Sequence, residues 1–591
     1  MPKYLKNILF FIIAYVFIFG FYLYVSPNIG DHAFGLHSRR FIPAALACIF
    51  PYILFKEFNI KNFKMELVLS ILWMVTSPYF AYLGSLKSGG NPSFPYDVAT
   101  GPYLFSTLVF AKILIQKYFN NILVKIFYYT LQLLLFTVPV FHSIYFIMFN
   151  HSMSSNGMMV IFQTNPAEAL EYLSSVKLQY ILPVVLLLVI FASTVIKNLR
   201  SSEILPNYNF SKNKLIISCI ILPVVGYYTL FSLIPRTQFV KTAMSTQGYF
   251  NAVEQYSALH SEVLKDLHVE SIGGVFNSSP NTIILVIGES ATRNYMKAFY
   301  NNNDETTPWL SSKKEEFLLF KNAYSCAWNT VPALEHALTE ANYYNDKEFN
   351  RSVSIIDIAK KAGYKTYWFS NQGKIGIHDT PITMVAETCD VAKWGGTSRY
   401  DEGLLTHLKT VNPNEKNFIV MHIMGSHIDY NHRYPQEYQI WTDPDTTGRV
   451  ADYKNSLVYT DKVLQDYFEY AEKNLNLSAF IYFSDHGTDP NRSRDPDETK
   501  FIGLRIPLFI YLSDDYKQNN QQTANALAAN KDKFFSNDLI YNLVCGILNV
   551  KSNHYNEEES LASSKYKFTI ENTKAGLGTK IVKDDPHLDT L

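Results

Sequence analysis

The sequence predicts an α/β catalytic domain with a mainly parallel sheet, joined to a polytopic α-helical membrane domain. Three observations predict this class. Long apolar runs lie before residue 236, short β-rich apolar runs alternate with helical patterns after residue 280, and polar side chains directly follow two of those short runs. A chain of 591 residues is also too long for one ordinary domain.

The long apolar runs predict helices that span a membrane. They lie at about 7–28, 40–56, 65–84, 101–117, 122–149, 178–196 and 214–235. The first run follows Lys3 and Lys6 and lacks a small-residue cleavage site, so it is expected to remain as an anchor. Lys112 lies inside the fourth run, and its charge is expected to snorkel to an interface. The membrane domain is therefore predicted over residues 1–235, with five to seven spans.

Basic residues in the connections predict the orientation of these helices. Most of them fall in alternate connections, which places the N-terminus inside and everything after Pro235 outside. Arg39 and Arg40 depart mildly from this distribution, because they lie on the outer side. The loop at 150–177 mixes polar with apolar residues and suits an amphipathic helix at the outer interface.

Charge and cysteine content exclude some classes of function. Lys+Arg and Asp+Glu both number 52, so no excess of positive charge indicates nucleic-acid binding. The five cysteines form no CxxC pair and no zinc-finger spacing. A single Cys326–Cys389 bridge is one option in an oxidising compartment.

The soluble half is predicted in three parts. A polar linker with helical stretches covers 236–280, a catalytic domain covers 281–552, and a polar, solvated extension covers 553–591. The predicted strands of the catalytic domain are 282–288, 365–370, 417–423, 479–484 and 506–512. In sheets of this kind, ligands bind beyond the carboxyl ends of the strands.

Residues of the types that bind metal ions directly follow two of those strands. Glu289 directly follows the strand 282–288, and Asp485 and His486 directly follow 479–484. Two carboxylates and an imidazole suit a divalent cation, and this mixture of nitrogen and oxygen favours zinc. Each residue alone would more often be an ordinary strand-end polar group, but their coincidence predicts a metal site.

Thr330 lies at or just before the predicted start of the helix PALEHALTEA. Backbone N–H groups at a helix N-terminus favour phosphate oxygens, so Thr330 is a candidate nucleophile toward a phosphate ester. Thr is also a common helix N-cap, and the sequence leaves both roles open.

Several motifs extend beyond these residues. They are QTNPAEAL (163–170), IGESATRNYM (287–296), TTPWL (306–310), NTVPAL (329–334), SNQ (370–372), HIMGSH (422–427), RYP (433–435), YTDKVL (459–464) and SDHG (484–487). With them the chain resembles the phosphoethanolamine transferases that decorate lipopolysaccharide and related surface glycans of Gram-negative bacteria. The resemblance implies an alkaline-phosphatase/sulfatase-like α/β/α sandwich in the periplasm, on an anchor in the bacterial inner membrane.

The resemblance also implies roles for individual residues. Glu289, Thr330, Asp485 and His486 would bind Zn²⁺, with Thr330 also the nucleophile, and His427 would hold the phosphoryl group or donate a proton. The residues expected to line the substrate pocket are Asn371, Gln372, His422, Arg433 and Arg494, each of which can equally serve structure. Phosphatidylethanolamine would be the donor, and a lipopolysaccharide or other surface glycan the acceptor. A monomer that binds membrane lipids and no nucleic acid is expected.

This sequence departs from the family pattern, so the identity of the acceptor stays open. Relatives usually have another histidine after SDHG, whereas this segment has only Arg492 and Arg494 as candidate phosphate ligands. Lipid A, core sugars, a periplasmic glucan or a protein all remain acceptors consistent with the sequence. The rival functions are a phosphoglycerol transferase of the lipoteichoic-acid-synthase type, a membrane-anchored sulfatase and a non-catalytic sensor. The QTN-x-x-EA loop argues against the first, and the lack of a sulfatase-type arginine after Cys326 argues against the second.

Overall fold

The computed structural model divides into two compact units, which are described separately. The first comprises residues 1–158 and 176–247, and the second residues 159–175 and 248–591. The structure describes residues 2–588 except 28–30, 56–57, 89–93, 120, 150, 165–169, 171–177, 201–211, 273–278, 301–302, 373–380, 443–448 and 492–499.

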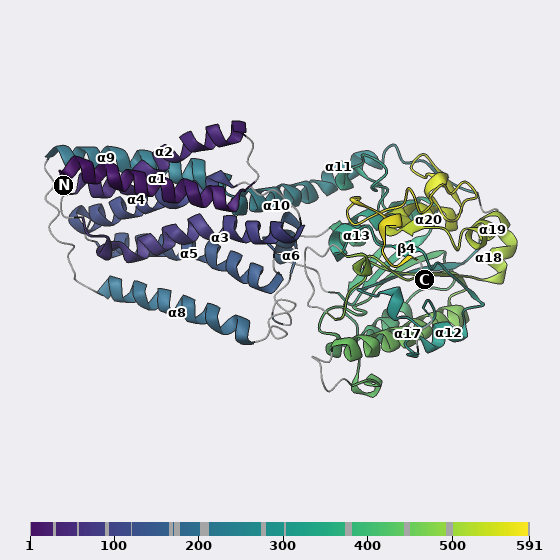
Figure 1. Ribbon diagram of the computed structural model, residues 1–591. Coiled ribbons are helices and arrows are strands. Elements are labelled where there is room, and N and C mark those ends of the chain that lie inside the picture. Colours follow the sequence, from purple (N-terminus) through teal and green to yellow (C-terminus); the bar gives the residue numbers. More distant parts are fainter. Residues whose placement is uncertain are drawn as a thin grey trace. The chain divides into compact units, whose positions relative to one another are not determined.

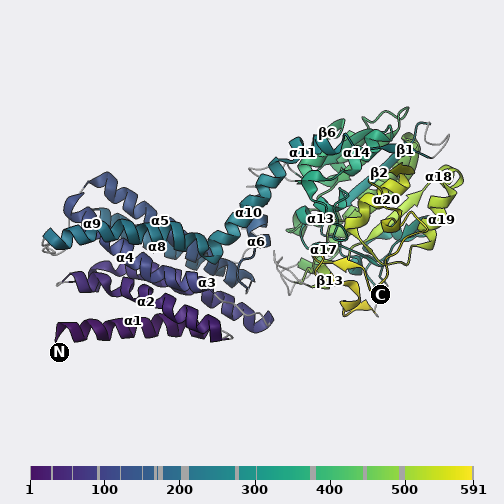
Figure 2. The same ribbon diagram turned by 90° about the horizontal axis from the view of Figure 1, so that it is seen from above.

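The first unit is a bundle of apolar helices (Figure 1, Figure 2). Its helices are α1 (Lys3–Val25), α2 (Asp31–Leu54), α3 (Lys64–Ser88), α4 (Pro95–Tyr118), α5 (Ile122–Phe149), α6 (Ser155–Gln163, which reaches the second unit), α8 (Leu178–Arg200), α9 (Lys212–Tyr227) and most of α10 (Gln238–Glu254). A π-helical turn, η2 (Tyr228–Leu233), and a 3-10 turn, η3 (Ile234–Arg236), follow α9.

Within the described residues, five helices are long and apolar enough to cross a membrane. They cover 4–25, 60–84, 95–118, 122–149 and 216–236. These five correspond to predicted runs, and the range of five to seven spans is met at its lower limit. The predicted run at 40–56 falls within α2, and the run at 178–196 falls within α8, whose apolar stretch Val185–Lys197 is shorter. Of the loop at 150–177, the structure describes α6, and most of the remainder lies outside the described residues.

The expectation that Lys112 snorkels to an interface stays a prediction, and the structure shows how its charge is paired. Helix α4 is the most buried of the five candidate spans, and Lys112 is 8% exposed on it. Its Nζ lies 3.0 Å from Oε1 of the fully buried Glu66 on α3. The Tyr128 hydroxyl and the Gln132 amide of α5 donate to the same oxygen over 2.9 and 3.2 Å. The charge is therefore neutralised inside the bundle, where a paired charge costs far less than a lone one.

The second unit is built around a seven-stranded sheet of order β3-β9-β8-β2-β7-β5-β6. Its strands are β2 (Thr282–Gly288), β3 (Phe317–Leu319), β5 (Lys365–Ser370), β6 (Val391–Trp394), β7 (Asn417–His422), β8 (Leu477–Ser484) and β9 (Leu508–Leu512). Strands β8, β2, β7, β5 and β6 run parallel, β9 is antiparallel to β8, and the edge strand β3 is antiparallel to β9. The mainly parallel sheet and all five predicted strands are therefore confirmed.

Helices cover both faces of this sheet, as Figure 1 shows. One face carries α11 (Tyr256–Val263), α13 (Thr330–Ala337), α14 (Ile355–Lys361), α15 (Pro381–Glu387), α18 (Asp514–Asn519), α19 (Gln521–Ala529) and α20 (Ile540–Ile547). The other carries α12 (Pro308–Ser312), α16 (Leu405–Leu408) and α17 (Arg449–Asn474). Along β2, Ile283 and Leu285 enter one core and Ile284 and Val286 the other, so this continuous apolar strand is buried on both sides. The predicted α/β/α sandwich is confirmed.

The expectation of a solvated extension at 553–591 is wrong. Three short pairs of strands lie outside the main sheet, the last of them within this segment: β1 (Val269–Ser271) with β11 (Val550–Ser552), β4 (Ala323–Tyr324) with β10 (Phe535–Ser536), and β12 (Lys574–Ala575) with β13 (Lys580–Ile581). Leu561 and Val582 are fully buried, and Asp585 pairs with the buried Arg505. Polar composition concealed these anchors because the few apolar residues are widely spaced.

All five cysteines are free, so the Cys326–Cys389 bridge is not formed.

Candidate metal centre

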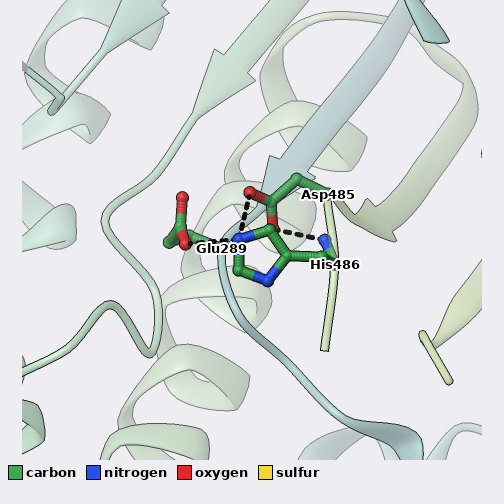
Figure 3. Close-up of side chains that lie close together, drawn as sticks. All are labelled: Glu289, Asp485 and His486. Carbon is green, nitrogen blue, oxygen red and sulfur yellow. Dashed lines mark hydrogen bonds and ion pairs between the residues drawn. The ribbon is translucent and has the colours of Figure 1, made fainter. Parts of the chain in front are cut away.

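Two neighbouring parallel strands bring the predicted metal ligands together. Gly288 of β2 lies opposite Ser484 of β8, so the next residues, Glu289 and Asp485, leave the sheet side by side. Both carboxyl groups and the His486 ring are buried, and one ligand atom from each lies within 4.8 Å of the others. Figure 3 shows the three side chains pointing toward one another.

The His486 ring is oriented to offer a lone pair to this centre. Its Nδ1 lies 2.8 Å from the carbonyl oxygen of Gly487, which accepts a hydrogen bond when Nδ1 carries the proton. The other nitrogen, Nε2, then lies 3.5 Å from Glu289 Oε1 and 3.4 Å from Asp485 Oδ2. A backbone carbonyl that fixes one imidazole nitrogen in this way is typical of histidine metal ligands.

The surroundings of Asp485 also fit a cation. Its Oδ1 accepts the backbone N–H groups of Ser290 and His486, over 3.0 and 2.6 Å. Its buried Oδ2 accepts no hydrogen bond from the described residues. Burial and the charge of Glu289 raise the pKa of Asp485 well above its usual value, and a divalent cation would offset both effects. The donor set thus fits a metal ion.

Thr330 faces the same centre from the first position of α13. Its Oγ1 donates to Glu289 Oε2 over 3.1 Å and lies 3.4 Å from His486 Nε2. The Thr330 side chain is half-buried. Ser325, another hydroxyl close to this centre, is fully buried and donates to the carbonyl oxygen of Asp485 over 2.6 Å. The geometry therefore favours Thr330 over Ser325 as the reactive hydroxyl.

Gln372 and Asn371 contact different parts of the site. The Gln372 amide donates to Glu289 Oε2 over 3.1 Å and to the carbonyl oxygen of Ile423 over 3.0 Å, which fixes the carboxylate. The Asn371 amide instead donates to Asp401 Oδ1 over 2.9 Å, away from the metal-ligand cluster. Gln372 is therefore placed to position a metal ligand.

The remaining candidates lie on or beside the loop after β7. His422 ends that strand; burial lowers its pKa to about 4, although the charge of Glu289 opposes the shift. Its Nδ1 lies 3.3 Å from Ser370 Oγ. His427 is half-buried on the loop. Arg433 donates to the carbonyl oxygens of His427 and Ile428, over 3.3 and 2.9 Å, and so braces that loop. Arg492 and Arg494 lie outside the described residues.

Three further residues hold the site and were not predicted. Asp401 accepts the N–H groups of Met424 and Gly425 over 2.8 and 2.9 Å, and Asn537 donates to the carbonyl oxygen of Asp485 over 2.6 Å. Gly425 has a φ of 47°, and a Cβ there would come within 3.0 Å of the Glu289 backbone. The glycine in the HIMGSH segment is the one signal in the sequence for this close approach.

Comparisons with known proteins agree with the fold and the motifs. Residues 281–544 match the sulfatase family of domains. The chain is 27% identical to phosphoethanolamine transferase EptC of Escherichia coli (strain K12) over 420 residues, 63% of this chain and 72% of that protein. It is 25% identical to phosphoethanolamine transferase CptA of Salmonella typhimurium over 481 residues, 72% of this chain and 80% of that protein.

A full-length membrane protein shares the overall fold. The integral membrane lipooligosaccharide phosphoethanolamine transferase A (EptA) from Neisseria meningitidis has a TM-score of 0.58 and 18% identity, covering 84% of this chain and 97% of that one. With the five apolar helices, these matches support the predicted location: an inner-membrane protein with a periplasmic catalytic domain. The resemblance found in the motifs is confirmed, since residues 281–544 form a sulfatase-family domain and the chain is similar to the phosphoethanolamine transferases.

Proposed function

We propose that this chain transfers phosphoethanolamine from phosphatidylethanolamine to a lipid A or lipopolysaccharide-core acceptor, through a covalent intermediate on Thr330. The observation that carries the proposal is the Thr330 hydroxyl, half-buried at a helix N-terminus and 3.1 Å from Glu289 Oε2. The similarity to proteins named phosphoethanolamine transferases supports the head group.

Glu289, Asp485, His486 and the Thr330 hydroxyl would hold a zinc ion, since their nitrogen and oxygen atoms match its usual ligands. Zinc bound there would favour ionisation of a hydroxyl and stabilise negative charge on phosphoryl oxygens. Gln372 keeps the Glu289 carboxylate oriented, and the Gly487 carbonyl keeps His486 in the tautomer that binds.

In the first step, Thr330 Oγ1 gives its proton to solvent and attacks the phosphorus of the donor. The phosphorus–oxygen bond to diacylglycerol breaks, and the diacylglycerol oxygen takes a proton, for which His427 is the candidate donor. Backbone N–H groups at the start of α13 can donate to the phosphoryl oxygens. The phosphoethanolamine group then remains as an ester on Thr330.

In the second step, an acceptor hydroxyl or phosphate oxygen attacks the same phosphorus from the side opposite the threonine oxygen. The bond to Thr330 breaks, and the hydroxyl is restored by a proton from the acceptor or from solvent. The two displacements use the same residues in reverse order.

The test is the intact mass of the full-length chain after incubation with phosphatidylethanolamine and zinc, without acceptor. We expect a phosphoethanolamine adduct on the wild type, located on Thr330 by peptide mapping, and none on Thr330→Ala. An adduct that persists in Thr330→Ala would exclude this nucleophile. Phosphatidylglycerol, run in parallel, distinguishes the rival phosphoglycerol transferase, because the adduct would then carry glycerol.

A further inference from the structure

Three cationic side chains of the membrane unit gather around one tyrosine ring. The centroid of the Tyr96 ring, at the start of α4, lies 4.5 Å from the Arg40 guanidinium carbon and 5.4 Å from that of Arg236. Lys241 Nζ lies 5.8 Å from the same centroid. The cations come from α2, η3 and α10, so three segments far apart in the sequence form this cluster.

The nearby carboxylate leaves the cluster with excess positive charge. Both oxygens of the buried Asp97 accept the backbone N–H of Gln238 at the start of α10, over 3.2 Å, and Lys241 also stabilises this carboxylate. In the described part of the chain, no ion pair joins Arg40, Arg236 or Lys241 to an acidic side chain. Arg40 is held in place by His37 Nδ1, 3.3 Å away, and by the tyrosine ring.

The cluster lies where a lipid headgroup would meet it. Tyr96 lies in the first turn of α4 and Arg236 ends η3, and the predicted orientation places both, with Arg40, on the outer side of the membrane, where positive charge is ordinarily depleted. Arg236 and Lys241 are exposed, and Arg40 is half-buried.

Exposed apolar side chains lie near the two arginines in the sequence. Ile42 and Phe231, which are 43% and 68% exposed, follow Arg40 and precede Arg236 on the same segments, and the predicted orientation places them further into the membrane. A ligand with both a phosphate and acyl chains would contact the cations and the apolar surface together. This combination favours a lipid over free phosphate.

We infer that Arg40, Arg236 and Lys241 form a site for the phosphate of a lipid headgroup in the outer leaflet, with anionic lipids bound most tightly. Guanidinium groups form paired hydrogen bonds with phosphate oxygens, and the tyrosine ring orients them in advance. The site shares no residue with the metal centre, and the inference does not rest on the proposed transfer reaction.

The test is lipid binding to the full-length chain in detergent, measured by native mass spectrometry. Thr330→Ala is present throughout, so that a bound donor is not consumed. Phosphatidylglycerol, phosphatidylethanolamine and diacylglycerol are titrated separately, and inorganic phosphate is the soluble competitor. The test variant is Arg40→Gln/Arg236→Gln. The matched control, Lys61→Gln/Lys64→Gln, removes two exposed charges from the predicted inner side.

We expect phosphatidylglycerol to bind more tightly than diacylglycerol, and the test variant to weaken it about twenty-five-fold, at about five-fold per cation. The control should change it less than about two-fold, and Arg40→Lys/Arg236→Lys should retain most of the affinity because it keeps both charges. Equal affinity in the test variant and the control would overturn the inference, as would displacement by inorganic phosphate at equal concentration. Adduct formation on Thr330 is a separate readout, so this failure would leave the transfer reaction untouched.

Discussion

Each unit of the chain buries a cluster of charged side chains, and the two clusters differ in their balance of charge. In the membrane unit, Glu66 is matched by Lys112, with hydrogen bonds from Tyr128 and Gln132. In the catalytic unit, Glu289 and Asp485 share one histidine, and Asp485 Oδ2 accepts no hydrogen bond within the described residues. The first cluster is balanced by its own side chains, whereas the second has a surplus of carboxylate that a cation would balance.

The comparison shows how burial of charge can serve structure or function. The ion pair between Lys112 and Glu66 joins α3 to α4, and its charges balance each other without a bound ion. A cluster with a surplus of carboxylate stores unfavourable electrostatic energy that a metal ion can relieve, and that energy becomes binding energy for the metal. The predictions below test this difference from the largest expected effect to the smallest.

Metal removal should affect the catalytic cluster alone. Chelation of the full-length chain should abolish phosphoethanolamine transfer, and zinc should restore it. At a zinc concentration about a thousand times its Kd, the metal should add about 4 kcal/mol to the free energy of unfolding of the catalytic unit. Thermal unfolding with and without chelator measures this. Asp485→Asn is the control, since its melting temperature should not respond to zinc, and an identical response would contradict the assignment of the ligands.

Breaking the membrane cluster should cost stability without altering the chemistry. Lys112→Met leaves Glu66 buried without its cation and should destabilise the membrane unit by about 3–5 kcal/mol. Lys112→Met/Glu66→Gln should recover most of that loss, because both charges are then absent. Unfolding in detergent is the measurement. Zinc affinity should be unchanged in both variants, and a loss of zinc affinity would show that the two clusters are coupled.

Gln372 tests how far the catalytic cluster depends on its neighbours. Gln372→Leu removes the amide that donates to Glu289 Oε2 and should weaken zinc binding about ten- to a hundred-fold. Asn371→Leu is the matched control, since its amide contacts Asp401 and not the cluster. Zinc titration monitored by recovery of activity distinguishes them. Equal losses in the two variants would assign Gln372 a general structural role.

A third buried pair, Arg505 with Asp585, predicts a smaller, pH-dependent effect. Burial raises the pKa of Asp585, but the hydrogen bond and charge of Arg505 outweigh burial and lower it overall. A carboxyl whose pKa is lowered on folding stabilises the fold above its ordinary pKa and loses that contribution as the pH falls through the folded value, below about 4. We expect a small loss of the free energy of unfolding there. Arg505→Met/Asp585→Asn should lack this part of the pH dependence in unfolding experiments, and an unchanged pH profile would exclude the pair as its source.

The sequence predicted the catalytic frame well because its signals are local. A continuous apolar run such as 282–288 specifies a strand buried on both faces, and the residue after it must lie at the carboxyl end of the sheet. Glu289, Asp485 and His486 could be found from that rule alone. The contacts of Gln372 with Glu289 and of Asp401 with the His427 loop depend on which strands become neighbours, and nothing near either residue encodes that.

The contacts that the sequence did not predict join residues that are remote from each other in sequence. In the sequence, Lys112 is a lone charge in an apolar run, because its partner Glu66 on α3 lies 46 residues away. The composition of the segment after 552 predicts exposure to solvent, because its charged residues outnumber the residues that pack. Asp585 nevertheless contacts Arg505, 80 residues earlier. Composition averages over a segment, whereas a few well-placed side chains decide whether it packs.

The packed C-terminal segment has a consequence for the order in which the protein matures. Leu577 donates its N–H to the carbonyl oxygen of Cys326 over 2.5 Å, and a Cβ at Gly576 would come within 2.4 Å of the Trp328 ring. These contacts hold the loop that leads to Thr330, yet they are made by residues that are synthesised long after that threonine. The seven-stranded sheet can form before this segment is made, but Thr330 gains its final support only when Gly576 and Leu577 have been synthesised and have packed.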